Sequence, residues 1–335
     1  MNWSLLGHEW AVDLLSQHVA QGQVRHAYLL TGPQGVGRRT LALRLAQALN
    51  CPQPEAPGQA CLKCKTCQRI QKMAYPDLSV VQAEQVGGTL KVEQVRELQH
   101  TLSLAPYEGR YRVALLLRFE EAHPSAANAL LKTLEEPSPQ VVLILTAESV
   151  ESLLPTIVSR CEVLRLRPLA LENLKRGLQT AYGLEAERAE LLAHLSAGRP
   201  GIALHLHEDP SELEQRQEWL EDLYQLLASN RVKRFGYIEP LAKKDDKEKL
   251  RNILLTWLTF WRDILLRTTG AETPIVNLDW EPRISKLAGY LDIASAQRVV
   301  ISLERTLDLL DRNVNARLAC EVLMLDLPRF SDVRD

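Results

Sequence analysis

A glycine-rich run is the first segment of this chain whose residue types could do chemistry. Gly32, Gly35 and Gly37 punctuate residues 32–40 (GPQGVGRRT), between a short apolar run and a helix-like stretch. Gly32 and Gly37 have the spacing of the P-loop pattern G-x-x-x-x-G-K-[ST]. In that pattern backbone N–H groups surround phosphates, the lysine reaches the terminal phosphates, and the hydroxyl binds magnesium. The glycines therefore predict a phosphate-binding turn.

The residues after the glycines depart from this pattern. Arg38 stands at the lysine position, Arg39 at the hydroxyl position, and Thr40 one place too late to fill the magnesium role. We interpret the loop as a P-loop descendant that no longer hydrolyses nucleotide. A glycine turn without ligand history and a working P-loop with arginine for lysine stay open as alternatives. The candidate nucleotide-binding residues are Gly32, Gly35, Gly37, Arg38, Arg39 and Thr40.

A second nucleotide-handling position is also changed. P-loop ATPases end a neighbouring strand in acidic residues that hold magnesium and orient the attacking water. The predicted strand over residues 112–117 is followed here by Arg118, and acidic residues come only at Glu120 and Glu121. We expect both glutamates in the following turn, with Leu117 and Arg118 replacing the acidic pair. A shifted register, with the glutamates as catalytic acids, is the alternative.

Four cysteines are clustered in 17 positions, as Cys51-x9-Cys61-x2-Cys64-x2-Cys67. Thiolates at this spacing can surround a tetrahedral ion, and in a chain that is not exported such clustering favours a metal over disulfides. The prediction is a structural Zn²⁺ site. Unrelated buried or redox-active cysteines and an iron–sulfur cluster are the alternatives.

Arg160 is the fourth candidate, in residues 155–161 (PTIVSRC) after a predicted buried strand. An isolated arginine at the edge of a strand and a helix is most often a partner in a surface ion pair. A catalytic role is the sharper alternative, and the residue alone does not decide between them.

The elements that must position these residues alternate between strand and helix. Apolar runs predict buried strands over 27–31, 77–82, 112–117, 141–146 and 163–166, with helices over 40–49 and 125–134. This alternation predicts a parallel sheet covered on both faces. After Pro168 strand patterns cease, and amphipathic helices follow, including 252–266 and a stretch over 297–327. The predicted apolar face of the latter comprises Val300, Ile301, Leu303, Leu307, Leu310, Val314 and Leu318.

Composition limits the class of protein. The chain has 335 residues, 46 % of them hydrophobic, and a formal net charge of −2. That charge removes the strongly basic character of a protein whose main task is to grip nucleic-acid backbone. No uncharged apolar run of 18 residues and no basic-then-apolar leader occurs, so we expect a soluble, multidomain, cytoplasmic protein with no membrane partner.

Taken together, these motifs resemble the AAA+ clamp-loader family of bacterial DNA polymerase III. The segments that carry the resemblance are 25–33 (RHAYLLTGP), the four-cysteine insertion, 126–137 (AANALLKTLEEP), 156–161 (TIVSRC), 195–201 (LSAGRPG) and 315–321 (NARLACE). The resemblance implies an α/β AAA+ P-loop domain over 1–167 with the zinc insertion at 51–67. An all-α lid over 168–207 and an all-α collar, or oligomerisation, domain over 208–335 would follow.

The resemblance also implies a function. Clamp loaders are pentameric ATPases that open the sliding clamp and close it on primed DNA. The partners would be the gamma/tau and delta subunits, the clamp, and primed DNA through the complex. Arg160 matches the family's arginine finger, which acts in trans on ATP bound by a neighbouring motor subunit. Gly201 stands where motor subunits carry a nucleotide-contacting lid arginine.

We therefore expect a non-hydrolysing stator subunit of such a loader. The first alternative is an active, gamma/tau-like ATPase motor subunit with an arginine-variant P-loop. The second is a zinc-dependent, nucleic-acid-binding repair protein built on a P-loop ancestor.

Overall fold

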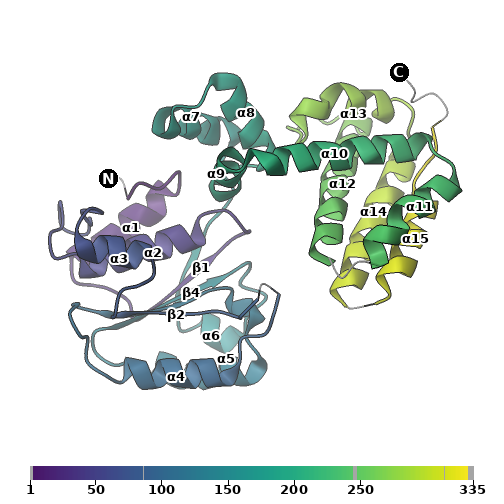
Figure 1. Ribbon diagram of the computed structural model, residues 1–335. Coiled ribbons are helices and arrows are strands. Elements are labelled where there is room, and N and C mark those ends of the chain that lie inside the picture. Colours follow the sequence, from purple (N-terminus) through teal and green to yellow (C-terminus); the bar gives the residue numbers. More distant parts are fainter. Residues whose placement is uncertain (1–2, 86, 244–246, 313, 331–335) are drawn as a thin grey trace. The chain divides into compact units, whose positions relative to one another are not determined.

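The computed structural model describes residues 3–85, 87–243, 247–312 and 314–330 (Figure 1). The chain forms two compact units. Unit 1 comprises Met1–Gly183 and Gly198–Ile202, and unit 2 comprises Leu184–Ala197 and Ala203–Asp335. The three-part division expected from the sequence stays a prediction.

Unit 1 is built on a five-stranded parallel sheet with strand order β2-β3-β4-β1-β5. The strands are β1 (Ala27–Thr31), β2 (Leu78–Val81), β3 (Arg112–Leu116), β4 (Val141–Ala147) and β5 (Glu162–Arg165). Every residue of β1, β3 and β4 is buried, as expected for strands covered on both faces. The five predicted strands are confirmed, and no end is shifted by more than one residue.

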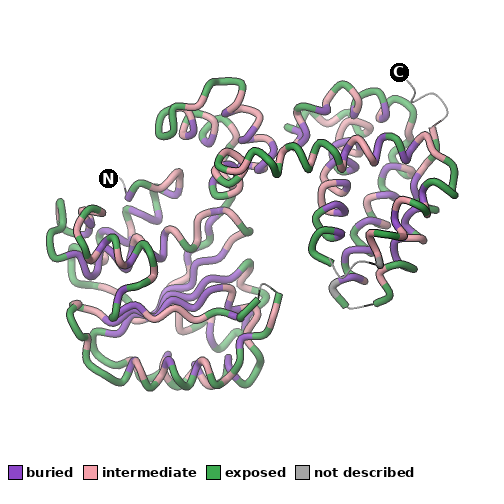
Figure 2. Tube along the Cα trace, viewed as in Figure 1, coloured by how far each residue is buried: buried purple, intermediate pink, exposed green. Residues whose placement is uncertain are grey.

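Helices cover both faces of this sheet (Figure 1). The helices α1 (Glu9–Ala20), α2 (Arg38–Asn50) and α3 (Lys65–Gln71) lie on one face, and α4 (Val92–Leu102), α5 (Pro124–Glu135) and α6 (Pro155–Val158) on the other. Each face has its own hydrophobic core, and the sheet between them is buried in Figure 2. A short 3₁₀ helix, η1 (Phe119–Glu121), follows β3, and α7 (Leu171–Tyr182) also belongs to unit 1. The predicted α/β architecture is confirmed.

Unit 2 is helical throughout its described residues. Its elements are α8 (Ala186–Leu195), most of α9 (Pro200–Glu208), α10 (Pro210–Ala228), α11 (Arg231–Lys243), α12 (Lys247–Thr268), the 3₁₀ helix η2 (Leu278–Trp280), α13 (Glu281–Ala288), α14 (Ile293–Asp311) and α15 (Ala316–Asp326). The core of the unit includes the fully buried Trp257, Phe260 and Trp261 of α12. None of the helices within the described ranges is both long and apolar enough to cross a membrane.

The predicted single apolar face over 297–327 is wrong in part. The chain forms two helices there, because the Asn315 side chain accepts a hydrogen bond from Leu318 N and starts α15 anew. Ile301, Val314 and Leu318 are 53 %, 45 % and 59 % exposed. Ile301 also lies off the face of α14 that is buried, which carries Val299, Leu303, Leu307 and Leu310.

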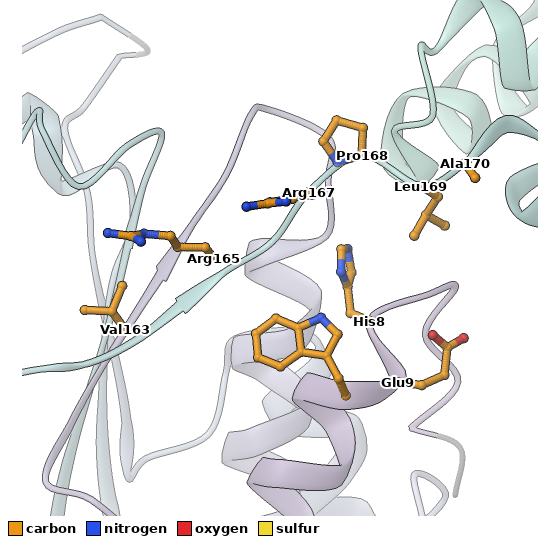
Figure 3. A pocket seen from close by; sticks show the side chains of 9 residues that line it. His8, Glu9, Val163, Arg165, Arg167, Pro168, Leu169 and Ala170 are labelled. Carbon is orange, nitrogen blue, oxygen red and sulfur yellow. The ribbon is translucent and has the colours of Figure 1, made fainter.

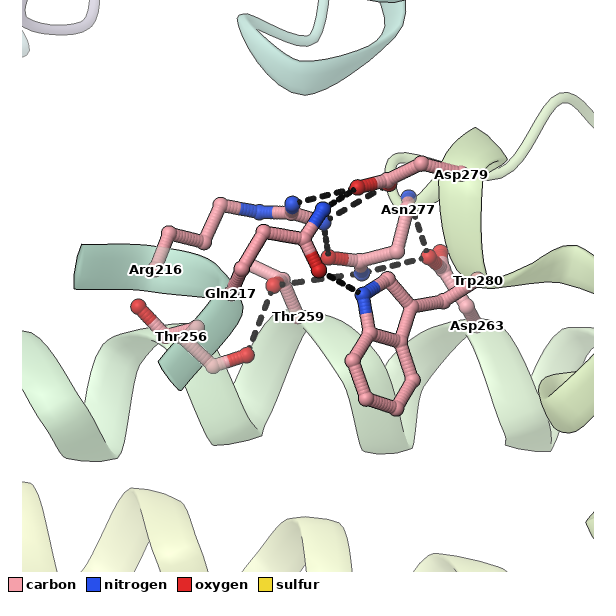
Figure 4. A network of polar contacts seen from close by, with 8 residues as sticks. All are labelled: Arg216, Gln217, Thr256, Thr259, Asp263, Asn277, Asp279 and Trp280. Carbon is pink, nitrogen blue, oxygen red and sulfur yellow. Dashed lines mark hydrogen bonds and ion pairs between the residues drawn. The ribbon is translucent and has the colours of Figure 1, made fainter. Parts of the chain in front are cut away.

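A polar network joins three elements of unit 2 (Figure 4). Arg216 of α10 forms an ion pair with Asp279 at 2.7 Å and donates to Asn277 Oδ1 at 2.6 Å. Asn277 in turn donates through Nδ2 to the buried Asp263 of α12 at 2.7 Å. The buried carboxylate and amide have partners, as buried polar groups require, so we assign this network to the stability of the unit.

Candidate functional site

The predicted phosphate loop lies between β1 and α2. Gly32, Gly35 and Gly37 have φ values of 144°, 81° and 111°, a region that favours glycine. A Cβ at Gly32 would lie 2.2 Å from the backbone oxygen of Leu166. Gly37 is the N-cap of α2 and offers no side-chain cap, so the first turn of the helix keeps free N–H donors. The backbone therefore retains the form of an anion-binding loop.

The two arginines after this loop have different surroundings. Burial lowers the pKa of Arg38, while the charges of Glu120 and Glu148 raise it and that of Arg118 lowers it. Nη1 of Arg38 is buried and has no protein partner. Arg39 is exposed and donates to Met73 Sδ at 3.5 Å. Only Arg38 therefore turns toward the acidic residues at the end of the sheet.

The glutamates after β3 lie in the turn η1, as predicted, but their surroundings differ. Glu121 pairs with Arg118 Nε at 2.9 Å and accepts from Gly87 N. Burial raises the pKa of Glu120, against the lowering effects of backbone amides and of Arg38. Glu120 is thus the acidic residue of this turn that shares the surroundings of Arg38, while Glu121 is held by a different arginine.

Gly201 lies directly against the loop. Its N–H donates to Gly35 O at 2.8 Å, and a Cβ added to Gly201 would lie 2.9 Å from that oxygen and 3.3 Å from Gly35 Cα. The side chain of Ile202 packs on the same glycine. A larger residue at position 201 would require this backbone contact to shift, so the contact favours glycine at this position.

Arg160 lies far from the loop in sequence, in the short connection between α6 and β5. Its Nη2 pairs with Glu135 at the last residue of α5, at 2.7 Å, and its Nη1 donates to Thr156 O at 2.9 Å. The two paired side chains are 35 % and 51 % exposed. Arg160 is therefore a partly exposed guanidinium held by a surface ion pair.

The four clustered cysteines come together, and their Sγ atoms lie within 4.8 Å of one another. Cys51 Sγ and Cys61 Sγ are 3.6 Å apart, and Cys61 Sγ and Cys67 Sγ are 4.0 Å apart. Tetrahedral zinc with Zn–S bonds of about 2.3 Å needs sulfur separations of roughly 3.8 Å. The cluster can hold a metal ion, and its geometry fits zinc.

Backbone donors also suit this cluster to thiolates. The N–H groups of Cys61, Cys64 and Cys67 each donate to the sulfur of the preceding cysteine at 3.3–3.4 Å. Burial acts to raise the pKa of Cys61, but backbone N–H groups, including those of Lys63 and Cys64, lower it to about 6. Since the thiolate is the form that binds metal, this favours ligation at Cys61, whereas burial raises the pKa of Cys51 and Cys67.

The segment over 51–67 that carries the four cysteines, here called the cysteine module, is packed on α1 and α2. Trp3 Nε1 and Ser16 Oγ both donate to Gly58 O, at 3.1 and 3.2 Å, and Gln47 Nε2 of α2 donates to Cys67 O at 2.8 Å. The module is thus a support for the helices on one face of the sheet.

A cavity of about 750 Å³ lies beside the loop (Figure 3). His8, at its margin, is tied to the loop through a 3.0 Å hydrogen bond between Nε2 and Val36 O. The cavity is lined by His8, Glu9, Trp10, Val163, Arg165, Arg167, Pro168, Leu169 and Ala170. The cavity has cationic and anionic side chains together, and nothing in the sequence pattern predicted it.

Glu148 is the residue of the loop region that reasoning from the sequence missed. It directly follows β4, and Gly32 N donates to Glu148 O at 3.1 Å. Neighbouring parallel strands end at one edge of the sheet, so an acidic residue two places after the predicted strand over 141–146 was the available signal. Using it required the strand order, which places β4 next to β1.

Two family models match this chain. The model described as DNA polymerase III, delta subunit, matches residues 7–170, and the model described as DNA polymerase III, delta subunit, C terminal, matches residues 210–328. Together they cover the α/β region that contains the loop, the cysteines and Arg160, and most of the helical region.

Individual relatives agree with these models. The DNA polymerase III subunit delta' of Pseudomonas aeruginosa is 35 % identical over 331 residues, which covers 95 % of this chain and 96 % of the relative. The DNA polymerase III subunit gamma of Buchnera aphidicola (subspecies Schizaphis graminum) is 30 % identical over 291 residues, covering 84 % and 78 %.

Among solved structures, a gamma subunit-related protein of Thermotoga maritima aligns with a TM-score of 0.51 at 17 % identity. The alignment covers 94 % of this chain and 97 % of that one, and it supports the fold alone. Fold, family models and relatives lead to one conclusion: the chain belongs to the delta' subunit family of DNA polymerase III and has an AAA+ fold.

Proposed function

We propose that this chain is a non-hydrolysing subunit of the DNA polymerase III clamp loader, which loads the sliding clamp onto primed DNA. In this role it supplies Arg160 to ATP bound on a neighbouring gamma/tau subunit and assembles with delta as a further partner. The observation that carries the proposal is the loss of nucleotide chemistry at several positions of one loop region. Arg39 replaces the magnesium-binding hydroxyl, Arg118 follows β3 in place of an acid, and Gly201 occupies the lid position.

The setting of Arg160 supports a role in trans. Its ion pair with Glu135 is partly exposed, and such pairs contribute only about 0–1 kcal/mol to stability. Exchanging Glu135 for a phosphate on another subunit is therefore energetically accessible. A planar guanidinium with several donors matches the oxygens of a transferring phosphoryl group and stabilises their charge.

The helical unit supports assembly with other subunits. A groove of about 400 Å³ between α14 and α15 is lined by exposed apolar side chains, including Ile301, Leu318 and Val322. Contiguous exposed apolar surface is typical of interaction sites. We assign this face to the predicted collar over 208–335. We place the predicted lid over 168–207, most of which lies between the two segments that the family models match.

We further propose that Cys51, Cys61, Cys64 and Cys67 hold one structural Zn²⁺ ion. The sulfur separations support this assignment, and all four thiols serve as ligands, which leaves no open coordination position of the kind catalytic zinc requires. The ion would supply folding free energy to the module that contacts Trp3 and Gln47, and no step of ATP hydrolysis would pass through it.

The alternative is an active motor subunit. The similarity to a gamma subunit favours it specifically, since that relative covers 84 % of this chain. The two functions differ in what the isolated chain does with ATP.

Steady-state ATP hydrolysis therefore tests the proposal. The purified chain alone should show no turnover above background, and adding it to gamma and delta subunits with clamp and primed DNA should raise the turnover of the mixture. Robust hydrolysis by the isolated chain, abolished by Arg38→Ala, would show instead that it is a motor subunit.

A further inference from the structure

The cysteine cluster is held both from within its own module and from outside it. The N–H groups of Cys61, Cys64 and Cys67 each donate to the sulfur of the preceding cysteine, and these contacts stay within the module. The first and last cysteines, which are the two buried ones, also have a partner outside the module. Cys51 N and Cys67 O both form hydrogen bonds with Gln47. The two ends of the module therefore meet at one residue of α2.

Gln47 makes these contacts with its backbone and with its side chain. Its carbonyl oxygen accepts from Cys51 N at 2.8 Å, in the hydrogen bond that ends α2. Its Nε2 donates to Cys67 O at 2.8 Å, and only 1 % of Gln47 is exposed. A buried amide needs hydrogen-bond partners, and this one finds its acceptor on a residue of the cluster. The side chain therefore connects the last cysteine directly to the helix that leads to the first.

Arg44, three residues earlier in α2, determines which way this amide points. Its Nη1 donates to Gln47 Oε1 at 2.8 Å and to Gln71 Oε1 at 3.0 Å. Gln71 is the last residue of α3, the helix that carries Cys67. In an amide the oxygen accepts and the nitrogen donates, so the reversed orientation of Gln47 would lose both of its side-chain hydrogen bonds. Arg44 thus keeps the donor of Gln47 directed at Cys67 O.

We infer that Gln47 is a positioning residue of the metal site and that Arg44 acts through it. Gln47 ligates nothing itself, but it holds the backbone of Cys67 where the sulfurs of Cys67 and Cys51 can share one ion. Hydrogen-bonded residues behind the ligands of a metal site typically change its metal affinity by about 10–100-fold. The inference rests on the structural zinc of the proposed function. The same contact joins the module to α2, the helix that begins at Arg38 of the loop.

The test measures how tightly the full chain holds Zn²⁺. Competition with a chelator compares the unmodified chain with Gln47→Met, which keeps the length of the side chain and removes both of its polar atoms. The affinity for Zn²⁺ should fall by about 10–100-fold, while circular dichroism shows that the zinc-loaded variant is folded. A glutamine with a merely structural role would destabilise the metal-free and zinc-loaded forms equally and would leave the affinity unchanged.

Two further variants separate the donor of Gln47 from its acceptor. Gln47→Glu keeps an oxygen for Arg44 and removes the donor to Cys67 O, so it should also lower the affinity. Arg44→Met should lower it less, because the donor to Cys67 O remains. Combined with Gln47→Met, Arg44→Met should cause no further loss, since residues that act through one contact are not additive.

Gln68→Met is the matched control. Gln68 directly follows Cys67, and its Nε2 also donates to a backbone oxygen of the module, that of Lys63, at 3.1 Å. Gln68 is exposed, however. Because water can replace an exposed hydrogen bond at little cost, the affinity of Gln68→Met should stay within about twofold of that of the unmodified chain.

The inference is wrong if Gln47→Met holds Zn²⁺ as tightly as the unmodified chain, or if Gln68→Met loses as much affinity. Should Gln47→Met fail to fold, Gln47→Glu and Arg44→Met are measured against the same criteria. An unmodified chain that binds no Zn²⁺ would overturn the structural zinc site and this inference with it. The non-hydrolysing role is tested separately by ATP turnover and would stand.

Discussion

Arg38 and Arg160 belong to the same α/β unit and differ in how their charges are compensated. Arg38 is half-buried, has one buried nitrogen without a hydrogen-bond partner among the described residues, and is subject to the charges of Glu120 and Glu148. Arg160 is partly exposed and is held by Glu135 and a backbone oxygen. The first arginine is subject to the charges of the half-buried Glu120 and the exposed Glu148, whereas the second has a surface partner that water or another subunit can replace.

Under the proposed function, this difference would let one AAA+ unit lose its own nucleotide chemistry and still serve that of a neighbour. Water screens the half-buried charges of Arg38 and Glu120 less than it screens exposed charges. Interactions between exposed charges are weak, so they leave Arg160 available.

Arg160→Ala should have the largest effect on ATP turnover of the reconstituted complex. An arginine finger is worth about 10³-fold or more at the site that it serves. The drop in total turnover will be smaller if ATP sites that receive their arginine from other subunits still hydrolyse ATP. The measurement is steady-state ATPase with clamp and primed DNA, and Arg160→Lys should rescue poorly because it lacks the planar fork. Unchanged turnover and unchanged clamp loading would show that Arg160 is only a surface residue.

Cys67→Ser should have the largest effect on stability. Losing a ligand of a structural site should reduce bound metal from one ion per chain and lower the free energy of unfolding by more than about 2 kcal/mol. The segment that carries the cysteines contacts α1 and α2. Loss of the metal should therefore destabilise the side of the sheet that α1 and α2 cover more than the region around Arg160. Elemental analysis and chemical denaturation measure both effects. The control is Cys161→Ser, which lies outside the cluster and should keep the metal. If protein prepared without chelators contains no metal, the assignment is contradicted.

Glu135→Gln should have only a small effect. It weakens an ion pair between partly exposed side chains, so the free energy of unfolding should fall by about 0.2–1 kcal/mol. ATP turnover of the complex should stay close to that of the unmodified protein. A loss as large as that from Arg160→Ala would mean that Glu135 positions the arginine for its role in trans, and the comparison would need revision.

Arg38→Lys combined with Arg39→Thr should produce no effect on hydrolysis. The change restores the P-loop pattern, but Leu117 and Arg118 still supply no acid to hold magnesium. The isolated variant should show background ATP turnover in a coupled assay. Hydrolysis restored by these two changes alone would show that Glu120 or Glu121 can serve as the catalytic acid.

Much of the local structure was predictable from the sequence. The five strands follow from apolar runs that only a sheet covered on both faces can bury. Likewise, the loop glycines have φ values of 81° to 144°, which few other residue types adopt, so the motif itself predicts this backbone conformation. The prediction failed over 297–327, because a local cap at Asn315 interrupts a periodicity that looked continuous.

The sequence by itself determined the residues that could do chemistry and the order in which they occur. Their partners depend on the tertiary structure, which brings Glu135 to Arg160 and Gly201 against Gly35. The physical reason is the range of the forces involved. Turn geometry and hydrophobic periodicity act over a few neighbouring residues, so they can be recognised in a linear pattern. Charge compensation and close backbone contact depend on distances between segments far apart in sequence, which strand order and packing alone establish.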